Sequence, residues 1–249
     1  MIYWQDYTWD EIEKLIPKLK AVILPVGSCE QHSLHLPLGT DTFGVIKLSE
    51  DIAKELKSEV LVLPPIWYGV SPHHMNFSGT ITISPETLMA LVYEIAESLY
   101  RHGVERMIII NGHGGNIDAL KLVIRRISDD LGMRVVLINP WELISDVIEK
   151  VVESKIWGHA CEFETSTALI EIPDKVRVGK IRRPNIKTPK IPYMALWEKN
   201  KVVIPWNTDD FTDTGAIGDP TKASKEKGEK LYKAMFERTL DFIKKFIES

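Results

Sequence analysis

Four short apolar runs, separated by longer segments of helical period, constrain the fold of this chain more than any other feature. The runs are AVILPV at 21–26, VLVL at 60–63, MIIIN at 107–111 and RVVLIN at 134–139. Short β-rich runs that alternate with helical segments are typical of parallel strands joined by crossover helices. The sequence therefore predicts an α/β fold with a mostly parallel central sheet.

The clearest helix begins at Ser84-Pro85-Glu86, where Ser can cap, Pro suits the first helical position and Glu complements the helix dipole. We expect it to end at Gly103. Its predicted buried stripe comprises Leu88, Leu91, Val92, Ile95 and Leu99. Further helices are expected after Asp41, after Asn116 and directly after Asp219-Pro220. The proline-interrupted residues 179–220 are expected to form loop and short strand that cover one face.

Length and composition limit the class of protein. The chain has 249 residues, of which 44% are hydrophobic, and we expect one domain spanning 1–249. The net charge of -4 gives no basic footprint for nucleic acid, and no apolar run reaches the roughly 18 residues of a membrane span. Two cysteines, Cys29 and Cys161, make no disulfide framework. These features favour a cytoplasmic protein that acts on a small molecule.

The segment 27–41 (GSCEQHSLHLPLGTD) has an unusual density of metal-ligating residue types directly after a predicted strand. Functional groups of open parallel sheets gather in loops beyond the carboxyl ends of the strands. In extended backbone, Glu30 and His32 point to the same side, and Asp41 can return from the start of the next helix. This segment predicts a divalent-metal site to which His35 contributes indirectly.

Two further segments carry compatible ligands. NGHGGN at 111–116 places His113 between a strand and a helix, although a glycine-rich loop of this kind could also bind an anion. HACEFETS at 159–166 adds His159 and two carboxylates. Glu162 and Glu164 share a side if this stretch is extended and diverge if it is helical. Spacing alone does not choose between them, and we favour Glu164 as the ligand.

Taken together, these segments resemble the creatininase family, the creatinine amidohydrolase-like metal hydrolases. The resemblance extends to YGVSPHHMNFSGTITI at 68–83 and to GAIGDPTKASKEKGE at 215–229, and so covers nearly the whole chain. It implies a three-layer α/β/α sandwich that assembles into a homo-oligomer, a hexamer in the family. Ser33 and Cys161 stand where the family usually has glycine.

The resemblance also implies a centre of two divalent ions, which are zinc, manganese or iron in family members. The residues that match Glu30 and His113 bind one ion, those that match His32 and Glu164 bind the other, and the match of Asp41 bridges them. His159 is then catalytic. Creatininase itself has a further carboxylate ligand two residues after its match to His113, whereas this chain has Gly115, which argues against creatinine as the substrate.

The predicted activity is hydrolysis of a carbon–nitrogen bond in a cyclic amide or formamide, with water activated by the ions and a proton shuttled by His159. His74 and Glu162 are the predicted substrate-binding residues. The alternatives are a formylaminopyrimidine nucleotide deformylase of flavin or deazaflavin synthesis, peptide trimming in redox-cofactor maturation, a metal phosphoesterase, and a non-catalytic metal-binding protein. A phosphate-bearing substrate would need cations at the pocket mouth, for which Arg182, Arg183 and Lys187 are available.

Overall fold

A four-stranded parallel sheet forms the centre of the computed structural model, which describes residues 1–191 and 202–249. The strands are β1 (Ala21–Val26), β2 (Val60–Val62), β3 (Arg106–Asn111) and β4 (Arg134–Ile138). Their order in the sheet is β2-β1-β3-β4, with all three pairs parallel. The four apolar runs thus form the four strands of the sheet, as predicted.

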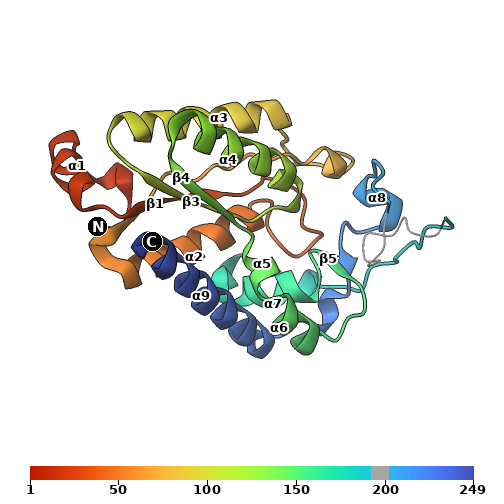
Figure 1. The fold of residues 1–249 in the computed structure, drawn as a ribbon. Helices are drawn as coiled ribbons and strands as arrows, with labels where there is room; N and C mark the ends of the chain where they lie inside the picture. Colours follow the sequence, from red (N-terminus) through yellow and green to blue (C-terminus); the bar gives the residue numbers. More distant parts are fainter. Residues whose placement is uncertain (192–201) are drawn as a thin grey trace.

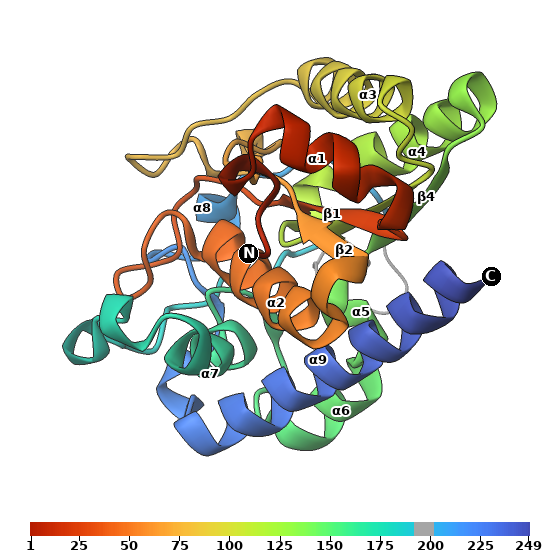
Figure 2. The same cartoon turned by 90° about the vertical axis from the view of Figure 1, so that its left-hand side faces the viewer.

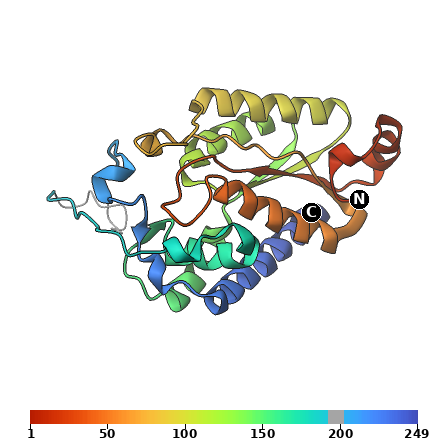
Figure 3. The same cartoon turned by 180° about the vertical axis from the view of Figure 1, so that it is seen from behind.

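Helices cover both faces of the sheet and give the three layers seen in Figures 1 and 3. One layer comprises α3 (Pro85–Arg101) and α4 (Ile117–Leu131). The opposite layer comprises α2 (Thr40–Leu56) and the C-terminal α9 (Lys225–Glu248). The mostly parallel α/β/α sandwich is confirmed.

Successive side chains of the central strand β3 point alternately into two hydrophobic cores, one on each face of the sheet. Met107 and Ile109 pack with α3 and α4, whereas Ile108 and Ile110 pack with α2 and α9. All four side chains are completely buried. Because successive side chains of a strand point to opposite faces, a strand covered by helices on both faces is apolar throughout.

The helices follow the sequence signals closely, with one correction to the buried stripe of α3 and one to the start of α9. The Ser84 side chain accepts a hydrogen bond from the Thr87 backbone N–H at 3.1 Å and caps α3 as expected. Leu91 was predicted to be buried but is 41% exposed, and Ala96 is buried instead, so the stripe is rotated slightly toward smaller side chains. The predicted helix start at Asp219-Pro220 is also wrong. Pro220 opens only a 3₁₀ turn, and α9 begins at Lys225 with Ser224 as its cap.

Shorter elements surround the carboxyl edge of the sheet. They are α5 (Pro140–Leu143), α6 (Ser145–Val151), β5 (Trp157–His159), α7 (Glu162–Glu171), α8 (Thr208–Phe211) and β6 (Ile217–Gly218), with β5 and β6 paired antiparallel. The α7 helix packs along α9, and α1 (Trp9–Leu15) lies at the β2 side of the molecule (Figure 2).

The predicted covering segment, residues 179–220, is loop apart from short turns, α8 and β6, and its residues 192–201 lie outside the described part of the chain. Among the helices of the described ranges, none combines the length and the hydropathy needed to cross a bilayer.

Candidate metal centre

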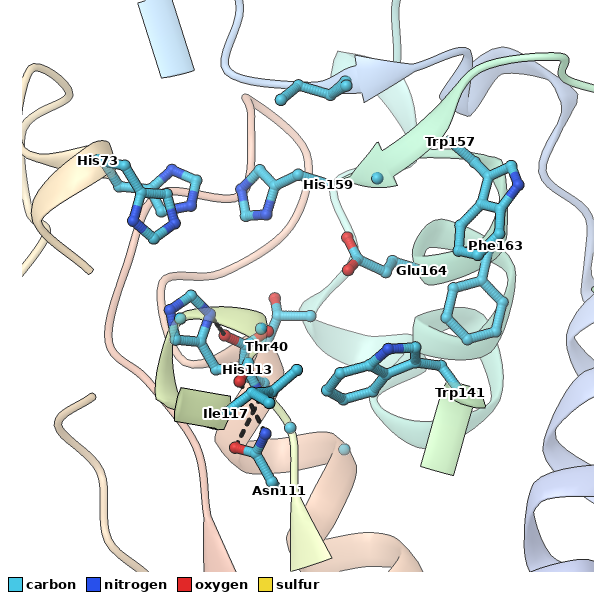
Figure 4. A pocket seen from close by; sticks show the side chains of 18 of the residues that line it. Thr40, His73, Asn111, His113, Ile117, Trp141, Trp157, His159, Phe163 and Glu164 are labelled. Atoms are coloured by element: carbon cyan, nitrogen blue, oxygen red, sulfur yellow. Dashed lines mark hydrogen bonds and ion pairs between the residues drawn. The ribbon is translucent and has the colours of Figure 1, made fainter. Parts of the chain in front are cut away.

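Polar side chains from two loops and from the start of α2 meet at the carboxyl ends of β1 and β3. Glu30 and His32 follow β1, Asp41 lies in the first turn of α2, and His113 follows β3. Asp41 and His113 line a cavity of about 730 Å³ together with His159 and Glu164 (Figure 4). Glu30 and His32 lie behind them and are almost completely buried.

The glycine-rich loop 111–116 brings three backbone segments into close contact. The Asn116 side chain donates to the Gly27 carbonyl at 3.0 Å and accepts from the Val70 backbone N–H at 2.9 Å. A Cβ added to Gly112 would lie 2.4 Å from the Asp41 carbonyl oxygen, and one added to Gly115 would lie 2.1 Å from the Val70 carbonyl oxygen. The glycines therefore serve close packing of these loops, and position 115 has no room for a carboxylate side chain.

The Asp41 carboxylate lies between two histidines. Its Oδ1 is 2.9 Å from His32 Nε2, and its Oδ2 is 3.2 Å from His113 Nδ1. His113 Nδ1 is also 3.2 Å from Glu30 Oε2. Four of the five predicted ligands therefore form one buried cluster, with Asp41 in the central position.

The tautomers of the histidines direct lone pairs into this cluster. His32 Nδ1 lies 3.2 Å from the Glu30 carbonyl oxygen, and His113 Nε2 lies 3.1 Å from the Val70 carbonyl oxygen. A carbonyl only accepts hydrogen bonds, so these nitrogens carry the hydrogens. The other nitrogen of each ring then faces a carboxylate oxygen, and it can coordinate a cation there when the ring is neutral.

A cation fits between such atoms. Among the described residues, Glu30 Oε1, His32 Nε2 and Asp41 Oδ2 are buried and have no well-aligned hydrogen-bond partner, although each lies close to another atom of the cluster. Ligands about 2.0–2.1 Å from one tetrahedral zinc ion lie about 3.3 Å apart, close to the separations found here. Among the described residues, two groups have one ligand atom each within 4.8 Å of the others: Glu30 with His32 and His159, and Glu30 with Asp41 and His113. The donor set therefore fits divalent metal.

The electrostatics of the cluster also favour positive charge. Burial lowers the pKa of His32, but Asp41 and then Glu164 and Glu30 outweigh this effect and raise it to about 9. Burial likewise opposes ionisation of Glu30, yet His113 and His74 hold the pKa of its carboxyl well below the usual range. The carboxylates here are stabilised only when cationic partners stand opposite them.

Ser71 is a supporting residue that the sequence reasoning did not identify. Its hydroxyl hydrogen-bonds to Glu30 Oε2, lies 3.1 Å from His113 Nε2 and lies 2.6 Å from the Ser28 hydroxyl. It comes from the segment after β2 and therefore ties a third strand end to the cluster. Serine is common in loops, and only knowledge of the fold would have singled it out.

The α7 helix separates the two glutamates that spacing left unresolved. Its first residue is Glu162, so the stretch is helical and the two side chains diverge. The Glu164 carboxylate accepts a hydrogen bond from the Ala160 backbone N–H and lines the cavity, where burial raises its pKa to about 7. It belongs to neither of the two compact ligand groups.

Glu162 does not reach the cavity, which argues against its predicted role in substrate binding. Its carboxylate accepts hydrogen bonds from the Glu153 and Ser154 backbone N–H groups at 3.1 and 2.8 Å, and from the Ser154 hydroxyl. Lys227 of α9 completes the set at 2.6 Å. The side chain is fully buried, and it ties α7 to its neighbours.

His159 enters the cavity from the end of β5. Its Nε2 donates to the Gln31 carbonyl at 2.7 Å, which leaves Nδ1 as a base 3.8 Å from Glu30 Oε1. Burial, with the nearby His74 and His32, holds its pKa well below the usual range. A neutral imidazole with a fixed tautomer can accept a proton at a known atom.

His74 lines the same cavity and contacts the cluster. Its Nε2 is 3.2 Å from Glu30 Oε1, and its Nδ1 lies 2.8 Å from both Gln31 Nε2 and Thr208 Oγ1. His35 is buried outside the cluster, where its Nε2 lies 2.8 Å from Thr165 Oγ1. His74 is thus placed to contact a ligand, whereas His35 supports α7.

The cations considered for phosphate recognition lie elsewhere. Arg182, Arg183 and Lys187 are exposed and do not line the cavity. Arg183 pairs with Asp219 at 3.4 Å, and Lys187 donates to the Asp209 carbonyl at 2.9 Å. The described residues around the cavity therefore offer no guanidinium or ammonium for a phosphate.

Fold and site together define a class of protein. It is a parallel α/β/α sandwich with a histidine–carboxylate cluster at the carboxyl edge of its sheet. A sequence profile of the creatininase family, described as creatinine amidohydrolase, matches residues 5–243. The chain belongs to the creatininase family.

The proteins to which this chain is similar are named as several different hydrolases. It is 29% identical over 180 residues to 3-dehydro-scyllo-inosose hydrolase of Thermotoga maritima, a match covering 70% of this chain and 57% of that protein. It is 29% identical over 243 residues to mycofactocin precursor peptide peptidase of Mycolicibacterium smegmatis, covering 95% and 88% of the two chains. Creatinine amidohydrolase of Pseudomonas putida is 27% identical, with 98% and 96% covered.

Solved structures agree with the fold. A crystal structure of creatinine amidohydrolase superposes with a TM-score of 0.82 at 26% identity and covers 100% of this chain and 98% of that one. A creatininase variant at 25% identity, with a TM-score of 0.81, is complexed with creatine and covers 98% of both chains. Other solved creatininases, at 24% identity, are of a Zn–Zn type or contain manganese.

Proposed function

We propose that this protein is a divalent-metal-dependent amidohydrolase that cleaves a carbon–nitrogen bond in a cyclic amide or formamide of a small molecule. One observation carries the proposal. The imidazoles of His32, His113 and His159 each donate to a backbone carbonyl and direct the other nitrogen toward buried carboxylates. Such an arrangement presents a converging set of lone pairs that suits a metal centre with an adjacent base.

The proposed ligand set has two parts. Glu30 and His113 would hold one ion, His32 and Glu164 the other, and Asp41 would bridge because its two oxygens face the two histidines separately. Zinc, manganese and iron are the candidate ions. When bound, such ions polarise a carbonyl and lower the pKa of water. Glu164, outside the compact groups, is the ligand whose place depends most on the presence of an ion.

His159 is the proposed general acid–base residue. Its Nδ1 faces the cluster, while the hydrogen bond from Nε2 to Gln31 fixes the ring. Nδ1 can therefore take a proton on the cluster side and deliver it to the departing nitrogen of the amide. The cavity on this side is also lined by His73, His74 and Trp206, which can orient the substrate.

A peptide bond is the second candidate target, because the peptidase relative matches 95% of this chain. A nucleotide deformylase is less well supported, since the arginines it would need lie away from the cavity. The proposed homo-oligomer, a hexamer by family resemblance, is separable from the chemistry and is tested by light scattering after gel filtration.

Elemental analysis and a substrate panel test the proposal. The purified protein is expected to contain divalent metal in stoichiometric amounts and to hydrolyse members of a panel of lactams, cyclic ureas, formamides and short peptides. Chelation should abolish turnover, and one of the three metals should restore it. Full turnover of the metal-free protein would refute the mechanism, and stoichiometric metal without turnover of any panel member would favour a non-catalytic binding protein.

The His159→Ala variant distinguishes whether His159 acts as a general acid–base residue or as a metal ligand. We expect turnover to fall about 10²–10⁴-fold, the usual contribution of a general acid–base, with metal content unchanged. Loss of one equivalent of metal in this variant would instead make His159 a ligand, as its place beside Glu30 and His32 also permits.

A further inference from the structure

The cavity extends well beyond the metal cluster along one face of α7. Glu164, Thr167 and Glu171 of this helix all line it, at positions i, i+3 and i+7. Seven residues are two helical turns, so Glu171 lies about 10 Å along the helix from Glu164. The proposed mechanism uses the Glu164 end and leaves the Glu171 end without a role.

The facing helix α2 shows the same spacing. Asp41, Gly44 and Leu48 line the cavity from its side. A Cβ added to Gly44 would lie 3.1 Å from Glu171 Oε2. Glycine inside a helix costs about 0.5–1 kcal/mol relative to alanine, so its presence here calls for a local reason. Gly44 leaves space beside the Glu171 carboxylate.

Within residues 1–191 and 202–249, the Glu171 carboxylate has no partner of its own. In the described residues, no hydrogen bond or ion pair joins it to a donor, and the nearby Lys47 binds Asp51 instead. Burial, with Glu164 as the next cause, raises its pKa to about 7. We call the Glu171 end of the cavity its arm, and the cavity lining includes the apolar side chains of Val45, Trp141 and Met235.

We propose that Glu171 determines substrate specificity by binding a primary ammonium group at the far end of the substrate. The arm would then take an amide whose reacting bond lies at the metal cluster and whose cationic end lies about 10 Å away across an apolar spacer. This inference rests on the proposed function for the reaction at the near end. An ammonium at Glu171 gives the carboxylate the donors that the described part of the chain does not provide.

Calorimetric titration tests the binding arm without turnover. The probes are n-hexylammonium and its neutral isostere 1-hexanol, each added to the protein as purified at about pH 8, where carboxyl groups of this kind are ionised. Wild type should bind the ammonium at least about tenfold more tightly than the alcohol, as one charge-assisted hydrogen bond allows. Glu171→Gln should lose this preference. The matched control Asp174→Asn, which removes an exposed carboxylate just after α7, should retain it. Equal binding of both probes by wild type, or a preference that survives in Glu171→Gln, overturns the inference.

A substrate series separates this inference from the proposed function. N-formyl-1,6-diaminohexane and N-formylhexylamine differ only in the terminal ammonium. Wild type should hydrolyse the first with a higher kcat/KM, and Glu171→Gln should make the two equal by raising KM for the first alone. Hydrolysis of both at equal rates by wild type overturns the inference and leaves the proposed function intact. An ammonium preference in calorimetry without hydrolysis of either formamide supports the subsite and counts against formamide hydrolysis.

Discussion

Two buried carboxylate clusters lie on opposite sides of α7 and differ in how their charges are balanced. Behind the helix, Glu162 accepts hydrogen bonds from Glu153, Ser154 and Lys227. In front of it, Glu30 and Asp41 face histidine nitrogens, and Glu30 Oε1 and Asp41 Oδ2 have no well-aligned hydrogen-bond partner among the described residues. A buried charge with a complete set of donors is part of the structure, whereas one without such a set marks a place for a ligand.

The largest expected effect is at the bridging position. Asp41→Ala should lower metal affinity by more than about 100-fold, the upper end of losses caused by mutating residues outside the ligand shell. An ion present at about 1,000 times its Kd adds about 4 kcal/mol to stability, and the variant should lose that increment. Urea denaturation with and without metal measures it. Metal-induced stabilisation that persists in Asp41→Ala would place the ions elsewhere.

The cluster around Glu162 should respond differently, with a loss of stability and no loss of metal. Glu162→Ala leaves Lys227 without its buried partner and should reduce the free energy of unfolding by about 3 kcal/mol. Metal content and KM should stay unchanged, because Glu162 lies outside the cavity. A variant as stable as wild type but altered in KM would restore Glu162 to the substrate site.

The two glutamates should also differ in the pH dependence of stability. Burial raises the pKa of Glu164 from an ordinary 4.5 to about 7, so its contribution turns destabilising as pH rises from about 4.5 to 7. In metal-free protein, Glu164→Gln should therefore gain about 3 kcal/mol over wild type above pH 7 and little near pH 4.5.

The contribution of Glu162 to the pH dependence of stability has the opposite sign. Burial opposes its ionisation, but hydrogen bonds from Lys227 and Ser154 prevail and lower its pKa. Its stabilisation is present above pH 4.5 and is lost as pH falls through the lowered pKa, so Glu162→Gln should be less stable throughout the range from pH 5 to 8. Parallel curves for the two variants in urea denaturation would contradict the contrast between the clusters.

The smallest effect is expected at Ser33, next to His32 of the histidine–carboxylate cluster. Its φ of 57° is in the left-handed region, which explains why glycine is usual at this position in the family. Ser33→Gly should change the free energy of unfolding by less than about 1 kcal/mol, since relief of strain and added chain entropy nearly cancel. Thermal unfolding measures the difference, and a large loss of metal would show that the Ser33 conformation positions His32.

The sequence predicted what local pattern and strand ends determine. The four strands, the capped start of α3 and the meeting of Glu30, His32, Asp41 and His113 follow from apolar runs and from the common edge of parallel strands. It did not resolve Glu162 from Glu164, because that choice depends on whether α7 has already begun at Glu162.

Other residues were missed for a related reason. Ser71 and Gln31 are ordinary polar residues whose partners lie far away in the sequence, and Glu171 is an ordinary helical glutamate that only the tertiary fold places in the cavity lining. The misplaced start of α9 shows the same limit, since Asp219-Pro220 is a good capping signal that here opens only a 3₁₀ turn. Only tertiary contacts distinguish such cases.

The spread of the proposed ligands along the chain has a consequence for how the centre is assembled. Glu30, His32, Asp41 and His113 are synthesised well before His159 and Glu164, which follow α6. A chain emerging from the ribosome therefore has no complete set of proposed ligands until Glu164, about two thirds of the way along its 249 residues, has been made. Affinities for first-row metals follow a fixed order in the absence of geometric constraint, so an early, flexible site would take the ion that binds most strongly. Late completion leaves the choice of ion to the folded geometry.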